Sequence, residues 1–537
     1  MSVRLPLVAT LAALAATALF VSTPAVAAPT SPASTSPTTT TAPAVGATGW
    51  LAQQFVGADG KPATTGDHFD YPPTPGYPPA YWAGLTASGV FALAAAKVGA
   101  DKIDHVLSYM AAQAKSDANI GTGMSPGPYD GSVATYALAA EVGGSDPADF
   151  GPDHLNLLQA LADDECTSVS APASATDYTT PTCPAVGAAR NIFSSVSESL
   201  AILAQARGGR QPSPAAVTYF LSLQCHSGGG FTGRTTACAN DSEASVDETA
   251  YAVMALQALG GHAAELNSAV NWLLAQRSPA GYWTAQGGPD VDSTGLAAAA
   301  LDGAGKDVSS SRTWLASQQV TDGPTVGAGA SRGALKFQGA FDASSSIKAT
   351  ADGVLGLAEH ASLATLTAAG ATASVPVLAL AAPVITSTSV RQGGAQTVTG
   401  TGFAAGEKVS GVLHSTPVAL GTVRADASGT ARLRFTVPST LATGTHTVVL
   451  TGQSGLTSRT SFTVTAAPAT APTTAPTTAP ATPAASQNGV DVSNCDPAQL
   501  ACTGRDGRQT RGELVLGVGL VLLGGLASYA GRRRRRS

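Results

Sequence analysis

The sequence has few charged residues, few aromatic residues and few cysteines. Charged residues make up 12% of the 537 positions, whereas a typical soluble globular protein has about 25%. The formal net charge of −6 gives the chain no electrostatic basis for binding nucleic acid. Six cysteines in a chain of this length exclude a small disulfide-stapled scaffold. Aromatic residues, at 5%, leave little material for an aromatic-lined substrate cavity.

The first 28 residues have the pattern of a secretory signal peptide. Arg4 supplies the positive start, residues 5–21 are an apolar run, and Ala25-Val26-Ala27 is a small-x-small cleavage site. Residues 29–45 are rich in Thr, Ser, Pro and Ala, so we expect a disordered linker there. The chain is therefore predicted to be exported.

The C-terminal segment 500–537 resembles a sortase sorting signal. A pentapeptide precedes an apolar run at residues 514–530 and a block of five arginines at 532–536. The run is just long enough for a transmembrane helix, and the arginines would stay cytoplasmic. The resemblance implies sortase cleavage after Thr503 and attachment to cell-wall peptidoglycan on a Gram-positive bacterium, so sortase and peptidoglycan are the implied partners. The alternative is a plain C-terminal membrane anchor. The pentapeptide residues are Leu500, Ala501, Cys502, Thr503 and Gly504.

Two segments before this signal differ sharply in pattern. Residues 466–493 contain Ala-Pro-Thr-Thr repeats, which predict an extended stalk. Residues 380–465 alternate β-branched and polar residues between Gly-rich turns, and about seven such strands predict an all-β immunoglobulin-like sandwich. The string Gly400-Thr401-Gly402-Phe403 resembles the early signature of bacterial surface immunoglobulin-like modules, whose usual role is that of a spacer or binding module.

The longest region, residues 46–372, contains an internal repeat. An Ala-rich apolar pattern recurs six times, and most copies follow a segment in which an aromatic residue stands four positions before a glutamine. The third copy lacks this aromatic–glutamine pair. We expect each copy to form a helix pair with unburied apolar surface, so that six pairs must stack and can close into a ring. The copies begin at Ser88, Val133, Ser199, Thr249, Thr294 and Thr350.

Two strings within this region carry a family resemblance. Gln276-Arg-Ser-Pro-Ala-Gly281-Tyr-Trp283 matches the Gln-x(2–5)-Gly-x-Trp motif of squalene and oxidosqualene cyclases, and Gln224 to Phe231 matches it with Phe for Trp. With the repeat, the region resembles the (α/α)6 toroid of terpenoid cyclases and protein prenyltransferases (the prenyltransferase and squalene oxidase repeat). In that family the motif residues tie helix ends to loops, so they indicate fold, not activity.

A second string bears on catalysis. Asp290-Val291-Asp292-Ser293-Thr294 resembles the Asp-x-Asp-Asp-Thr motif of squalene–hopene cyclases, whose central Asp, here Asp292, protonates the substrate. Ser293 departs from the motif and removes one carboxylate that would help to keep a neighbour protonated. The alternative is favoured: Asp292 and Asp247 both stand two residues before a repeat Thr, which predicts helix capping. Asp290 and Asp292 thus remain candidates without an established role.

Four cysteines fall within the helical region. Cys166, Cys183, Cys225 and Cys238 allow three pairings, and short loops favour 166–183 and 225–238. In an exported chain these residues are expected to form disulfides, so we predict no metal site and no cofactor. One Pro-rich loop is a candidate ligand-binding segment, because its exposed rings suit stacking on a sugar or peptide; the alternative is packing on the ring rim. Its aromatic residues are Tyr71, Tyr77, Tyr81 and Trp82.

Together these features predict a cell-wall-anchored surface protein that presents a toroid to bind a small molecule, a glycan or a protein partner. The alternative is an exported terpenoid-cyclase-like enzyme with Asp292 as general acid. A third hypothesis is a purely structural spacer.

Overall fold

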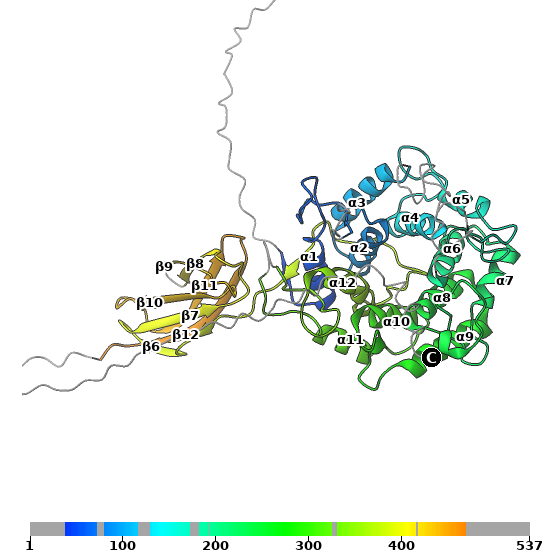
Figure 1. The fold of residues 1–537 in the computed structure, drawn as a ribbon. Coiled ribbons are helices and arrows are strands. Elements are labelled where there is room, and N and C mark those ends of the chain that lie inside the picture. The colour runs from blue at the N-terminus through cyan, green and yellow to red at the C-terminus, as the bar shows by residue number, and fades with distance from the viewer. Residues whose placement is uncertain are drawn as a thin grey trace, which may run out of the picture.

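The structure is a computed structural model that describes residues 38–71, 80–115, 129–171, 182–192, 194–324, 330–414 and 417–468. In these ranges α-helices form a ring, and most of the strands form a separate unit beside it (Figure 1). The predicted signal peptide, the sorting pentapeptide and residues 514–530 lie outside the described ranges. Within the ranges, no helix is both long and apolar enough to span a membrane.

Six Ala-rich helices form the inner wall of the ring. Each contacts the next one in sequence, and α12 contacts α2, so the circle is closed as predicted (Figure 1). Nearly every side of these helices is buried, which explains their composition, because alanine and glycine let helices approach closely. The inner helices are α2 (Ala83–Ala95), α4 (Asp130–Gly143), α6 (Ser195–Arg207), α8 (Val246–Leu259), α10 (Val291–Gly303) and α12 (Ala343–Leu357).

Six further helices form the outer layer, and each packs on one or two inner helices. Five of them carry the predicted aromatic–glutamine pair at or near the C-terminal end. The outer helix of the third repeat, α5, spans only seven residues, and the leucines Leu157, Leu158 and Leu161 are buried there instead. The outer helices are α1 (Pro43–Leu51), α3 (Ala100–Gln113), α5 (Leu157–Asp163), α7 (Pro214–Ser222), α9 (Ala263–Gln276) and α11 (Ser309–Ser317).

The predicted disordered linker, residues 29–45, is wrong at its C-terminal end. Strand β1 (Thr39–Thr40) pairs in parallel with β4 (Val377–Leu378), and α1 already begins at Pro43. Proline suits the first position of a helix because its fixed φ is helical and no donor is lost there. The local composition, which lacks charged and aromatic residues, could not predict β1, because this strand is stabilised by β4, more than 300 residues away.

Loop-to-helix hydrogen bonds repeat around the ring. The backbone N–H groups of Phe231 and Trp283 donate to the Oγ1 atoms of Thr249 and Thr294, at 2.9 and 3.0 Å. These threonines are the repeat residues that mark the start of inner helices. Between the layers, Gly281 has a φ of 94°, and a Cβ there would lie 2.5 Å from the backbone carbon of Ser310. The motif residues thus hold the helix pairs together, which is the role that the family resemblance implies.

A strap, residues 358–378, leaves α12 and crosses the C-terminal ends of the other inner helices. It forms hydrogen bonds at the ends of α10, α8, α6, α4 and α2 in that order, so it covers this side of the ring. Its residues Ala361, Ser362, Leu363 and Leu366 are buried. The bonded pairs are His360–Asp302, Ser362–Gln257, Leu366–Arg207, Ala368–Val142 and Thr372–Lys97.

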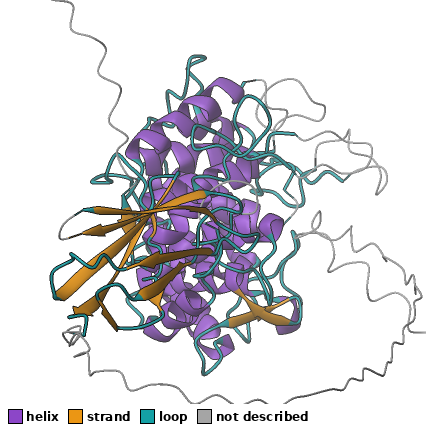
Figure 2. Ribbon diagram, turned by 90° about the vertical axis from the view of Figure 1, so that its left-hand side faces the viewer, coloured by secondary structure: helices purple, strands orange, loops and turns teal. Residues whose placement is uncertain are grey.

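The strap leads into a two-sheet β-sandwich, which stands beside the ring in Figure 1 and in front of the ring helices in Figure 2. One sheet has the order β10-β7-β5 and the other β6-β12-β11-β8-β9, so the region is a β domain of two sheets, as the strand pattern predicts. The two sheets enclose a separate apolar core. The strands are β5 (Val384–Ile385), β6 (Ser389–Arg391), β7 (Ala395–Gly400), β8 (Lys408–His414), β9 (Val418–Arg424), β10 (Ala431–Thr436), β11 (Gly444–Gly452) and β12 (Thr457–Thr465).

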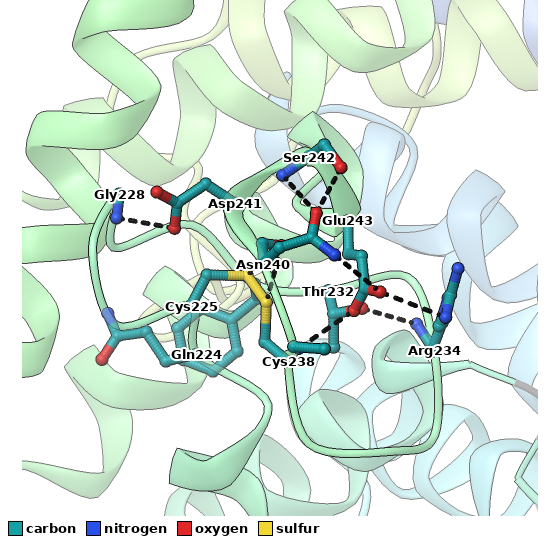
Figure 3. The surroundings of a disulfide bond; sticks show 12 residues. Gln224, Cys225, Gly228, Thr232, Arg234, Cys238, Asn240, Asp241, Ser242 and Glu243 are labelled. Carbon is teal, nitrogen blue, oxygen red and sulfur yellow. Dashed lines mark hydrogen bonds and ion pairs between the residues drawn. A yellow bond between two sulfur atoms is a disulfide. The ribbon is translucent and has the colours of Figure 1, made fainter.

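Two disulfides staple loops of the ring, in the pairing that loop length favours: Cys166–Cys183 and Cys225–Cys238. Figure 3 shows the second one with its surroundings. There the short 3-10 helix Asp241–Glu243 begins at Asn240, whose side chain accepts a hydrogen bond from the Ser242 N–H at 3.1 Å. This network orders the loop that enters α8.

Candidate functional site

The hairpin formed by β2 (Trp283–Ala285) and β3 (Gly288–Asp290) ends at the start of α10. Asp290 is the N-cap of this helix, because its carboxylate accepts a hydrogen bond from the Ser293 N–H at 3.1 Å. Its other oxygen accepts from Nε2 of Gln338 at 2.9 Å. Burial, together with the charge of Asp292, raises the pKa of Asp290 to about 6. Both carboxylate oxygens of Asp290 are therefore used to hold the start of α10.

The favoured capping interpretation of Asp292 and Asp247 is wrong, because neither side chain accepts a hydrogen bond from a helix-start N–H group. Asp292 instead forms an ion pair with Lys348 on α12, with both carboxylate oxygens 2.8–2.9 Å from Nζ. Capping requires a side chain at the position before the helix, and Asp290 occupies that position. Asp292 lies two residues further on, where its side chain reaches the neighbouring inner helix.

Lys348 also binds Asp352, one turn later on α12. We call Asp292, Lys348 and Asp352 the Lys348 cluster. The side chain of Asp352 is 2% exposed and that of Asp292 17%. That of Lys348 is 44% exposed, although it lies inside the ring, because it lines the central cavity.

The three charges of the cluster depend on one another. Burial alone would lower the pKa of Lys348, but Asp292 and Asp352 outweigh it and hold this pKa well above its ordinary value. Burial would raise the pKa of Asp292, but Lys348 outweighs it and the pKa is lowered. For Asp352, burial dominates and the pKa is raised well above its ordinary value. The cluster therefore favours the charged forms of Asp292 and Lys348 and disfavours the ionised form of Asp352.

Two residues of α8 adjoin the cluster. Asp247 has a buried Oδ1 atom without a hydrogen-bond partner, and burial, with the neighbouring charges of Asp292 and Glu248, raises its pKa to about 7. Tyr251 follows one turn later and lines the central cavity. Burial and then Asp352 raise the pKa of its phenol, so the hydroxyl stays neutral and can both donate and accept.

The central cavity has a volume of about 160 Å³. A cavity of about 150 Å³ with apolar walls holds one benzene molecule, so the space suits a ligand of about one six-membered ring. Most of its wall is apolar, and its polar groups are the hydroxyls of Ser88, Thr135 and Tyr251 and the ammonium of Lys348. The lining residues are Trp82, Gly84, Leu85, Ser88, Phe91, Thr135, Leu138, Leu200, Tyr251 and Lys348.

The predicted aromatic loop contributes to this cavity in part. Trp82 lines it, and Tyr71 stacks on Trp82 with ring centroids 4.4 Å apart. The hydroxyl of Tyr81 lies 3.2 Å from that of Tyr136 on α4. Tyr77 lies outside the described residues. Trp82 is thus the predicted ligand-binding residue that the structure places at the candidate site.

A second group of buried acids holds a loop. The N–H of Ala189 donates to Oε2 of Glu198 at 2.9 Å, and the N–H of Arg190 donates to Oδ2 of Asp130. Burial is the main cause that raises the pKa of Glu198 to about 8. These carboxyls are not among the cavity-lining residues, so we interpret them as structural. In the described ranges, no group of three or more His, Cys, Asp and Glu residues is arranged to hold a metal ion.

No protein-family model and no curated protein matches this chain. Solved structures do match part of this chain. A type II terpene cyclase, MstE from Scytonema, is 13% identical and covers 60% of this chain and 97% of its own, with a TM-score of 0.39. A protein from Actinoplanes is 14% identical over 61% of this chain and all of its own, with a TM-score of 0.40. The Candida albicans protein geranylgeranyltransferase-I is 13% identical over 52% and 88%, with a TM-score of 0.35.

Proposed function

We propose that the ring is a binding module that captures a small molecule in its central cavity. The observation that carries this proposal is a cavity of about 160 Å³ whose wall on α2, α4 and α6 is mainly apolar and to which α8 and α12 contribute Tyr251 and Lys348. Pockets of this composition, apolar with a few convergent polar groups, are the usual form of ligand sites. The strap covers one side of the ring, so a ligand would enter from the other.

The alternative function, a cyclase with Asp292 as general acid, requires a protonated Asp292. The ion pair with Lys348 lowers the pKa of this carboxyl instead, and an ionised carboxylate cannot donate a proton. The cavity is also far too small for the long isoprenoid chain of such substrates. Both observations favour binding over cyclisation.

We further propose that the chain presents this module outside the cell, attached to the cell wall. The two disulfides support an oxidising, extracellular environment, and the pentapeptide 500–504 supports sortase attachment. Cell fractionation tests the anchor. Thr503→Ala should move the protein from the wall fraction to the membrane fraction, and an unchanged distribution would refute sortase attachment.

The binding proposal is tested with the full-length protein expressed in its exported form. Native mass spectrometry should detect a small molecule that is carried through purification, and Leu200→Trp should abolish it by filling the cavity. Leu221→Trp is the matched control, because Leu221 is a partly buried leucine on the outer helix α7. Absence of any bound molecule, or equal retention in Leu200→Trp, would refute capture in this cavity.

A further inference from the structure

The wall of the central cavity carries one charged group, the ammonium of Lys348. This ammonium contacts both oxygens of Asp292, at 2.8 and 2.9 Å, and one oxygen of Asp352. Neither aspartate is among the residues that line the cavity. A ligand anion would have to compete with Asp292 for the ammonium, and a ligand cation would meet the ammonium without a carboxylate to pair with. The wall therefore disfavours ions of both signs, because an unpaired charge is costly to remove from water.

Two of the lining hydroxyls already use their hydrogen atoms. Ser88 on α2 donates to the carbonyl oxygen of Gly84 at 3.2 Å, and Thr135 on α4 donates to that of Gly131 at 2.7 Å. Each hydroxyl oxygen keeps lone pairs that can accept a hydrogen bond. A ligand that carries a donor can satisfy these lone pairs, whereas an ether or a ketone cannot.

The third lining hydroxyl belongs to Tyr251 on α8. Charged neighbours act on this phenol through space, but within the described part of the chain its oxygen forms no hydrogen bond, so it is able to donate and to accept. In the closed ring α8 stands opposite α2, because two inner helices separate them on each side (Figure 1). The rings of Trp82 and Phe91 line the cavity from the α2 side. A ligand that fills the cavity therefore meets these two rings on one side and a hydroxyl open to bonding on the other.

We propose that the ligand is a small neutral alcohol or phenol with a body of about one ring. Its hydroxyl group bonds to the phenol of Tyr251, and its ring lies against Trp82 and Phe91. A sugar would leave most of its hydroxyls unpaired against the leucines of the wall, which disfavours it. This inference rests on the proposed binding function and adds the chemical class of the ligand.

Four probes of similar size test this chemistry: benzyl alcohol, toluene, benzylamine and benzoate. Calorimetry on the full-length protein at pH 7, where the amine and the acid are ionised, should show no binding of the two ions. Benzyl alcohol should bind at least as tightly as toluene, because a hydroxyl left unpaired in the cavity would cost affinity.

A matched pair of variants tests the contact with Tyr251. Tyr251→Phe should weaken benzyl alcohol binding about ten-fold through the loss of one hydrogen bond and leave toluene binding unchanged. Tyr282→Phe is the control, because Tyr282 is a half-buried tyrosine that packs on Trp314 and does not line the cavity. It should change the affinity of neither probe.

The outcomes separate this inference from the binding function. If toluene or either ion binds more tightly than benzyl alcohol and Leu200→Trp abolishes that binding, the alcohol is refuted and the binding function stands. If benzyl alcohol binds but Tyr251→Phe weakens neither probe, or weakens both equally, the contact with Tyr251 is refuted. If only a co-purified molecule binds, a neutral ring with a hydroxyl supports the inference, and an ion or a molecule without a hydroxyl refutes it. If no probe binds and no molecule co-purifies, both proposals fail.

Discussion

The ion pair between Lys348 and Asp292 permits a sharp test of how the ring tolerates charge. Lys348→Met keeps an unbranched side chain that is one atom shorter and removes the cation. Removing one partner of a fully buried pair costs about 3–5 kcal/mol. The side chain of Lys348 is 44% exposed, so solvent screens part of this loss, and we expect the free energy of unfolding to fall by about 1–2 kcal/mol at pH 8.

The loss should depend on pH in a defined direction. In the wild-type protein the pKa of Asp292 is lowered, so its contribution is present above the ordinary carboxyl range and is lost only in strong acid. In the variant, burial without a cation raises the pKa values of Asp292 and Asp352. A carboxyl whose pKa is higher in the folded state lowers the free energy of unfolding as pH rises from its unfolded-state pKa to its folded-state pKa. The loss of stability of Lys348→Met relative to the wild-type protein should therefore be small at pH 4.5 and complete at pH 8.

Urea unfolding followed by tryptophan fluorescence measures this deficit. All five tryptophans lie between residues 50 and 314, so the signal reports the ring and not the sandwich. With a slope of about 3 kcal/mol/M, the midpoint should fall by roughly 0.5 M at pH 8. Asp292→Asn in the same chain should recover part of the loss, and Lys306→Met, at an exposed lysine, should cost less than about 0.5 kcal/mol. An equal deficit at both pH values, or no recovery in the double variant, would refute the assigned charges.

Three further perturbations follow from the same structure. Replacing both Cys225 and Cys238 by serine opens a loop with a sequence separation of 13 and should lower the unfolding free energy by about 3 kcal/mol; an unchanged urea midpoint would contradict this. Gly281→Ala combines a positive φ with a Cβ 2.5 Å from a backbone carbon and should lower the free energy of unfolding by more than about 2 kcal/mol. Gly287→Ala has a positive φ but no atom within 4 Å of the added Cβ, so it should cost about 1 kcal/mol. Equal losses in the two variants would exclude a contribution from the steric clash at Gly281. The folded-state pKa of Glu198 is raised to about 8, so its contribution to the free energy of unfolding should be complete in mild acid and lost as pH rises to 8. Glu198→Gln should therefore reduce the fall in Tm between pH 5 and pH 9. A fall in Tm equal to that of the wild-type protein would refute this.

The architecture of the ring could be predicted because its determinants are local and repeated. Thr249 and Thr294 mark helix starts in successive copies, and each accepts the N–H of a loop aromatic residue. The aromatic–glutamine pair did not predict the outer helix α5, because leucines replace the aromatic residue there. It also failed at Thr39–Thr40, whose partner strand lies far along the chain.

The candidate site could be predicted only in part. Asp292 drew attention through its motif, but its partner Lys348 is 56 residues away and only the closed ring brings the two together. One signal was present in the sequence: Lys348 and Asp352 are charged residues four positions apart in a segment that otherwise reads as a buried helix. Charges on a wall of small apolar residues are rare unless they are paired, so they could have indicated an ion-paired cluster.

The parallel pairing of β1 with β4 has a mechanical consequence. The residues that enter the ring and those that leave it for the sandwich are bonded side by side, with Thr38 accepting from Val377 and Thr40 from Ala379 at 3.0 and 2.9 Å. A pull that separates the N-terminal segment from the sandwich therefore loads these bonds in shear, all at the same time. The ring of described helices is then a closed side branch that does not carry the force, and its cavity would keep its shape while the chain is under tension.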